Sequence, residues 1–297
     1  MPDISAAAHF MTSTARLLDR RRFAVRFQGA PSAPALAALE AYRNDDGGYG
    51  ALEPDLRAVE SQPVGAMHAF EVFEDVAPAT SPRAVELCDW LAAATLGDGG
   101  LPFALPVADA TATAPFWATA DPTESSLHIT AAVAAVAHRV ARHDPAVAAH
   151  PWLETVTRYG LGAVAERDRP SSTLELLYAL GFLEAVATGP SPDTAEAVEL
   201  LGRWAQVLPD DAIMPVEGGL ADEVIRPLDF SPWPDGPLRE RIPADVVAAD
   251  LDRLAAGQRD DGGWDVDFTA YSPAAALEWR GYTTVAALTV LRAHGRA

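Results

Sequence analysis

The sequence contains no lysine, and all 22 basic side chains among its 297 residues are arginines. The chain therefore cannot form a Schiff base through a lysine amine, and it lacks the lysine on which a P-loop phosphate site depends. Its single cysteine, Cys88, allows no internal disulfide and no thiolate-rich zinc site. Because Cys88 lies in a helical pattern, we interpret it as a small buried apolar residue.

Long hydrophobic runs are also missing. The longest apolar helical segment, Ile129 to Ala137, ends at His138 and is shorter than the roughly 20 residues that cross a bilayer. The short apolar stretch near the N-terminus precedes the arginines at 20–22, which is the reverse of a secretory signal. We therefore expect a cytoplasmic protein without an integral membrane segment. A formal net charge of −20 repels phosphate groups, so we expect no nucleic-acid partner.

Most of the chain carries a helical hydrophobic period, with abundant Ala and Leu and few alternating β-branched residues. This pattern predicts an all-α protein with helices near 4–20, 32–42, 63–75, 82–95, 122–142, 151–166, 171–188, 192–207, 243–257 and 280–294. Three Ser-Pro or Asp-Pro pairs, at 81–82, 121–122 and 191–192, are typical helix starts. The longest loop covers 208–242. No linker divides the chain, so we expect a single domain over 1–297.

Gly-Gly pairs recur at 47–48, 99–100, 218–219 and 262–263. An acidic residue directly precedes each pair, and an aromatic residue or leucine directly follows it. Such a repeat predicts about five to six helical hairpins, which stack as an open solenoid or close into a ring.

The last repeat is the most specific. Gln258-Arg-Asp-Asp261-Gly-Gly-Trp264, followed by a segment rich in Thr, Ala and Leu from Thr283 to Leu291, resembles the repeat of squalene–hopene cyclases, other class II terpene cyclases and protein prenyltransferase β subunits. The resemblance implies an α/α toroid in which inner helices begin after each Gly-Gly turn. Glycine permits the positive φ of a tight reversal. Gln258, Asp261 and Trp264 are then expected to hold the scaffold together.

Chemistry in such a ring is expected at the starts of the inner helices. Class II cyclases place an Asp-x-Asp-Asp-Thr-Ala motif there, whose central aspartate protonates an alkene or epoxide. Residues 119–123 retain only one of those aspartates. The resemblance implies that Asp121 is the catalytic acid, with Glu124 or His128 as its partner and Trp117 against the substrate. The alternative is that Asp121 caps a helix and His128 is a packed polar residue.

A second candidate region is 264–283, which combines acids, aromatics and an arginine. Its candidate substrate-binding residues are Asp265, Asp267, Glu278, Trp279, Arg280 and Tyr282. A Glu-Arg pair beside aromatic rings can hold a polar group at a cavity mouth, or can lock the last hairpin. His68, on the helix at 63–75, is more typical of a hydrogen-bonded core histidine.

These patterns favour a terpene-cyclase-like enzyme that uses acid-initiated cyclisation on a small apolar or isoprenoid ligand. We expect no cofactor and no metal, because the sequence lacks the Asp-Asp-x-x-Asp motif and the zinc ligands of the prenyltransferases. One alternative is a non-catalytic binding or scaffold toroid that has lost the acid motif. Another is a carbohydrate-active toroid with paired carboxylates, Asp121 with Asp265 or Glu278. A polar cavity with two facing carboxylates would favour the last.

Overall fold

The computed structural model describes residues 1–297 and consists of helices, short 3-10 turns and one two-stranded hairpin. The all-α expectation is therefore confirmed. The helices are α1 (Ile4–Ser13), α2 (Leu17–Gln28), α3 (Ala33–Leu39), α4 (Pro63–Asp75), α5 (Pro82–Ala94), α6 (Pro115–Ala118), α7 (Leu127–Ala141), α8 (Pro145–Ala148), α9 (Pro151–Ala165), α10 (Thr173–Thr188), α11 (Thr194–Trp204), α12 (Pro227–Phe230), α13 (Ala244–Ala256) and α14 (Pro273–Ala293). Strands β1 (Met214–Pro215) and β2 (Val224–Ile225) pair antiparallel, and the 3-10 turns are η1 (Glu40–Tyr42), η2 (Ala205–Val207) and η3 (Pro237–Arg241).

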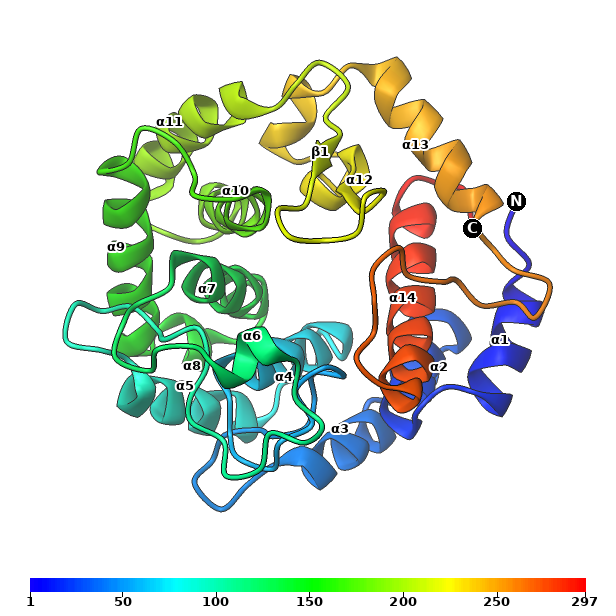
Figure 1. Cartoon of the computed structure of the whole chain (residues 1–297), viewed down its shortest axis with the longest axis horizontal. Coiled ribbons are helices and arrows are strands. Elements are labelled where there is room, and N and C mark those ends of the chain that lie inside the picture. Colours follow the sequence, from blue (N-terminus) through cyan, green and yellow to red (C-terminus); the bar gives the residue numbers. More distant parts are fainter.

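The helices form an outer set and an inner set, as Figure 1 shows. Helices α1, α3, α5, α9, α11 and α13 lie on the outside, and α4, α7, α10, α12 and α14 lie nearer the centre. Contacts run in the order α14, α2, α4, α7, α10 and α12, with α2 between the inner helices α14 and α4, and α13 contacts both α12 and α14. One inner position is therefore held by α12, which has only four residues.

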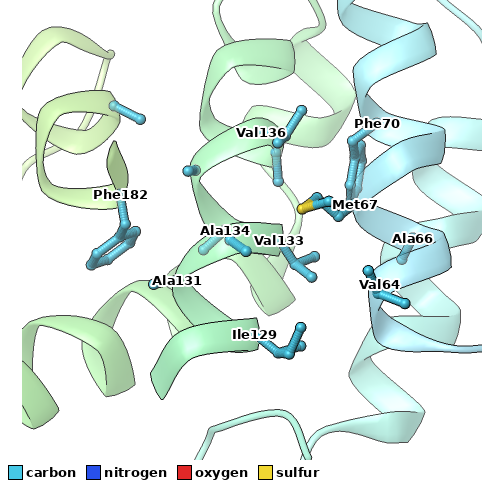
Figure 2. Close-up of a cluster of buried hydrophobic side chains, with 14 of the residues drawn as sticks. Val64, Ala66, Met67, Phe70, Ile129, Ala131, Val133, Ala134, Val136 and Phe182 are labelled. Atoms are coloured by element: carbon cyan, nitrogen blue, oxygen red, sulfur yellow. The ribbon is translucent and has the colours of Figure 1, made fainter. Parts of the chain in front are cut away.

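The best-packed part of the interior lies along α7. Residues 127–141 are almost all buried because this helix has α4 on one side and α10 on the other. In Figure 2, Met67 and Phe70 of α4 face Val133 and Val136 of α7, and Phe182 extends from α10. A helix that is apolar on nearly every face fits an interior position. None of the helices combines the length and the hydrophobicity that a bilayer-spanning segment requires.

Three of the Gly-Gly pairs form the same turn. In each, the first glycine has a φ of 93–94° and the preceding aspartate accepts a hydrogen bond from the N–H of the second glycine. These turns cover 44–48, 96–100 and 259–263 and connect an outer element to the segment before an inner helix. The fourth pair differs, because Gly218 lies in the turn of the β1–β2 hairpin and connects no two helices.

The last Gly-Gly turn also binds the N-terminal residues of the chain. The Gln258 side chain accepts a hydrogen bond from the N–H of Asp3 at 2.6 Å and donates to the Asp3 and Gly262 carbonyls. The Trp264 indole donates to the Leu254 carbonyl at 2.8 Å. These contacts confirm that Gln258, Asp261 and Trp264 hold the scaffold.

Several helix boundaries differ from the sequence-based expectation. The segment 4–20 is interrupted at 14–16, and α2 continues to Gln28. Helix α7 begins at Leu127 rather than at 122, because Ser126 caps it by accepting a hydrogen bond from the Ile129 N–H. Helix α14 begins earlier than predicted, at Pro273, with Ser272 as its cap. In both cases a serine with an oxygen within reach of the first-turn amides sets the start.

Gly262 offers a test of the turn geometry. A methyl group at Gly262 would lie 2.2 Å from the Ala6 carbonyl oxygen, in addition to the strain of its positive φ. Gly262→Ala is expected to cost about 1–2 kcal/mol for the left-handed backbone and about 1–3 kcal/mol for overpacking. Gly218→Ala is the matched control, since its φ is also positive but no atom lies within 4 Å of the added methyl. Equal losses of unfolding free energy in chemical denaturation would contradict the close approach of α1.

Candidate functional site

A cavity of about 730 Å³ lies at the centre of the inner helices. Helices α4, α7, α10 and α14 and the segment 229–236 line it, and 11 of its 22 lining residues are hydrophobic, so its wall is mixed rather than apolar. On every one of those helices the first lining residue is the fifth or later: Met67, Ala132, Leu177 and Tyr282. The cavity therefore lies away from the helix starts, where the sequence had placed the chemistry.

The cavity exists where the inner position is not filled by a full helix. Segment 229–236 replaces a helix wall with Phe230 and Trp233. Arg239 holds this segment by donating to the Ser231 carbonyl and, at 3.2 Å, to the Trp233 carbonyl. The Glu184 carboxylate of α10 accepts a hydrogen bond from the Leu238 N–H at 3.2 Å. Loop 208–242 is thus fixed against α10 and forms one wall of the site.

A buried ionic network forms the opposite wall. The two ring nitrogens of His68 face carboxylates, with Nε2 2.8 Å from Glu53 and Nδ1 3.2 Å from Glu71. Glu71 also accepts a hydrogen bond from the Tyr282 hydroxyl at 2.7 Å and lies 3.3 Å from Arg22. An imidazole can donate from both nitrogens only when it is protonated. The geometry therefore requires the imidazolium form of His68.

The titration of this network follows from its contacts. Burial alone would lower the pKa of His68, but the charge of Glu71 and the hydrogen bonds to both carboxylates raise it to about 9. Burial alone would raise the pKa of Glu71, but His68, Arg22 and the Tyr282 hydroxyl lower it to about 2. The two shifts are two sides of one interaction. Glu71 therefore presents a permanent carboxylate to the cavity.

Asp229, on α12, is a carboxyl group whose pKa is raised, in contrast to that of Glu71. Its Oδ2 accepts a hydrogen bond from the Arg226 N–H at 2.8 Å, within the first turn of α12. The side chain lines the open cavity and is exposed there, but many protein atoms lie close around its carboxyl group. Burial, with a further contribution from Asp250, raises the pKa of Asp229 to about 6. Asp229 can therefore carry or release a proton near neutral pH.

Tyr178 of α10 lines the same cavity as these two carboxyl groups. Burial and the negative charges of Glu53, Glu71 and Asp229 raise the pKa of its hydroxyl. Its ring stacks on His128, with ring centroids 4.6 Å apart. Phe103 contacts the other side of His128, and Trp117 stacks on Phe103 at 4.5 Å. An aromatic column thus supports the cavity wall from beneath.

The structure separates the three predicted catalytic residues. Asp121 is exposed, and its hydrogen bonds from the Thr123 side chain and N–H lower its pKa, which favours the carboxylate over the neutral acid. Glu124 is exposed in the loop before α7, so the expected helical i,i+4 pairing with His128 does not form. Burial lowers the pKa of His128 to about 4, so this histidine is neutral and packed. None of the three lines the cavity.

The predicted substrate-binding residues are also dispersed. Tyr282 is the one that lines the cavity, whereas Trp117 lies in the aromatic column beneath it. The Trp279 indole donates to Asp55 at 2.7 Å. Asp265 pairs with Arg280 at 2.7 Å, and Asp267 is exposed.

The expected pair of Glu278 with Arg280 does not form. Glu278 pairs instead with Arg57 at 2.6 Å. Arg280 makes two 2.9 Å hydrogen bonds to Asp261 and lies over the Phe10 ring. Both residues therefore lock neighbouring segments together, as the structural alternative proposed.

Sequence reasoning missed most of the polar residues that line the cavity: Glu71, Arg139, Arg142, Tyr178, Glu184 and Asp229. Four of these six lie within α4, α7 and α10, whose other residues are largely apolar, and Arg142 directly follows α7. Charged side chains on such helices stand out, because a helix buried on all faces has no solvated side for them. No three His, Cys, Asp or Glu side chains are grouped so that they could hold a metal ion.

The comparisons with known proteins bear on the fold alone. No family model matches the chain, and no curated protein matches its sequence. A crystal structure of a protein from Actinoplanes is similar to 98% of this chain over 98% of its own length, with a TM-score of 0.56 and 16% sequence identity. At that identity the similarity describes the arrangement of the helices and not an activity.

The ionic network predicts how stability depends on pH. Because the pKa of His68 is raised from 6.5 to about 9, its stabilisation is complete below pH 6.5 and is lost as pH rises toward 9. Because the pKa of Glu71 is lowered from 4.5 to about 2, its stabilisation is present above pH 4.5 and is lost as pH falls toward 2. Melting temperatures measured between pH 2 and pH 9 should therefore be highest between pH 4.5 and pH 6.5.

His68→Gln should abolish the alkaline decline and lower the stability near pH 6 by an amount on the order of 3 kcal/mol, since one pKa unit corresponds to about 1.4 kcal/mol. His9→Gln, at an exposed position on α1, should leave the profile unchanged. An alkaline decline of the same size in His68→Gln would show that another group causes it.

Proposed function

We propose that the chain is an α/α toroid enzyme that binds a small polar, sugar-like substrate in its central cavity and cleaves it with the carboxyl groups of Asp229 and Glu71. The observation that carries the proposal is that one cavity holds two carboxyl groups whose environments push their pKa values apart, to about 6 and about 2. Such a pair is the arrangement in which one carboxyl acts as the acid and the other stays charged.

The two groups have separate parts in the proposed hydrolysis. Asp229 donates its proton to the leaving oxygen as the glycosidic carbon–oxygen bond breaks. The Glu71 carboxylate stabilises the positive charge that develops at the anomeric carbon. A water molecule then adds its hydroxyl to that carbon and gives its proton to the Asp229 carboxylate, which restores the acid. His68 and Arg22 keep Glu71 ionised throughout, and the Tyr282 hydroxyl fixes its orientation.

The walls of the cavity also suit a sugar. Tyr178, Trp233 and Tyr282 supply aromatic surface on which an apolar sugar face can pack, beside carboxylates and arginines that bond to hydroxyls. The resemblance to terpene cyclases supports the ring of helices. It does not supply an acid for cyclisation, because Asp121 is exposed and ionised. A purely scaffolding role is disfavoured, because the centre is open rather than packed.

The test is hydrolysis of a panel of 4-nitrophenyl glycosides, followed by release of nitrophenol. Once a substrate is found, Asp229→Asn and Glu71→Gln are each expected to lower kcat by at least about 100-fold, the usual contribution of an acid or charge-stabilising group. Asp121→Asn is the matched control, since it removes an exposed carboxylate outside the cavity and should leave kcat unchanged.

Two outcomes would contradict the proposal. One is turnover of an isoprenoid by the wild-type protein together with failure to bind or cleave any glycoside. The other is a glycosidase activity that survives both Asp229→Asn and Glu71→Gln while the variants remain folded by circular dichroism.

A further inference from the structure

The cavity has two arginines at the C-terminal end of α7. Arg139 and Arg142 both line it, one turn apart on the same face of the helix. Arg139 is partly buried, and Arg142 is exposed at the cavity mouth. Because the chain has no lysine, these two guanidinium groups are the fixed positive charges of the cavity wall.

The bonding of the two arginines leaves donors free. Arg139 uses its Nε atom for both oxygens of Glu74, each at 3.0 Å, and its two Nη atoms make no hydrogen bond. Arg142 makes one hydrogen bond, from Nη2 to the Thr188 hydroxyl at 2.6 Å, and forms no ion pair. Neither guanidinium lies within ion-pair distance of Glu184 or Asp235, the carboxylates on that part of the wall. Arg142 thus has no direct ion-pair partner, and the charges of Glu74 and Glu184 act on it only from a longer distance.

The environment of Arg142 disfavours its charged form. Burial and the adjacent charge of Arg139 lower the pKa of the Arg142 guanidinium. Two like charges in one partly enclosed space repel each other unless an anion lies between them. Most other arginines that lie close to a partner arginine in this protein share a carboxylate, as Arg22 and Arg26 share Asp75.

We propose that Arg139 and Arg142 form a subsite for an anionic group of the substrate, a carboxylate or a phosphate, at the mouth of the central cavity. Guanidinium groups suit either anion, because their planar N–H pairs match two oxygens at once. The inference rests on the proposed function and adds to it that the substrate is an acidic sugar. The anion would be held beside Thr188, whose hydroxyl already positions Arg142.

The experiment is calorimetric titration of the full-length protein with glucose, glucuronate, glucose 6-phosphate and inorganic phosphate. At least one acidic sugar is expected to bind tenfold or more tightly than glucose, with an affinity that falls as salt is added. Glucuronate against glucose 6-phosphate distinguishes a carboxylate from a phosphate as the preferred anion.

Arg142→Gln should abolish the preference for the acidic sugar. This variant loses one exposed side chain whose only hydrogen bond is to Thr188, so its fold should persist. Arg158→Gln is the matched control, because Arg158 is an exposed arginine of α9 that pairs with Glu154 and does not line the cavity. It should retain the full preference.

The outcomes separate the two proposals. Equal affinities for glucose and the acidic sugars, or an undiminished preference in Arg142→Gln, would overturn the subsite while leaving the sugar site intact. Binding of inorganic phosphate that requires Arg142, without binding of any sugar, would support the subsite and contradict the proposed function. Failure to bind any of the three anions would overturn the subsite.

Discussion

A buried imidazolium between two carboxylates is the interaction on which the centre of the molecule depends. His68 of α4 binds Glu53 in the preceding loop and Glu71 on its own helix. Glu71 in turn binds Arg22 of α2 and Tyr282 of α14. Helices α2 and α14 lie far apart in the sequence but contact each other, and α2 also contacts α4. Removing one partner of a buried ion pair typically costs about 3–5 kcal/mol, because the remaining charge stays unpaired. The network therefore holds α2, α4 and α14 together.

The same network explains how one cavity keeps two carboxyl groups in different states. Glu71 faces a cation on one oxygen and a hydroxyl donor on the other, so its charged form is stabilised despite burial. Asp229 has a single backbone donor and acidic neighbours, so burial dominates and its neutral form is stabilised. The two groups differ in the number of their donors, and Asp229 is also the more exposed of the two. Acid–base chemistry at neutral pH needs this kind of asymmetry.

Local patterns were sufficient to predict most of the longer helices and three of the four Gly-Gly turns, but not α2 as a separate helix or the four-residue helices α6, α8 and α12. The positive φ of Gly47, Gly99 and Gly262 follows from the Asp-Gly-Gly sequence, because only glycine adopts it without strain. The helix start at Leu127 was missed because Asp121-Pro122 competes with Ser126 as a start signal. The start at Pro273 was missed although Ser272-Pro273 is a Ser-Pro signal of the same kind as 81–82. Such boundaries are the least determined part of any sequence-based prediction.

The site was less accessible to sequence reasoning, for a physical reason. The cavity arises where segment 208–242 takes the position of an inner helix, and nothing local in a Pro- and Gly-rich sequence states against which helix it will pack. The residues that could have been recognised are those on apolar helices. Helix α10 is apolar on every face except for a few side chains, among them Tyr178 and Glu184. A charged or hydroxyl-bearing residue in such a helix has no solvent to face, and so must face a partner or a cavity.

The two ends of the inner helices therefore have different functions in this fold. The Gly-Gly turns lie before the N-terminal ends and are held by backbone hydrogen bonds and by an aspartate that accepts from the second glycine N–H. The cavity reaches the C-terminal ends of α7 and α10, where unpaired carbonyls give each helix a partial negative charge. That charge opposes the binding of any anion there, and it also stabilises cations placed in the last turn. Arg139 and Arg142 lie at that end of α7, so the helix stabilises the two guanidinium groups. The guanidinium groups in turn offset the negative helix end, which allows the mouth of the cavity to accept an anion.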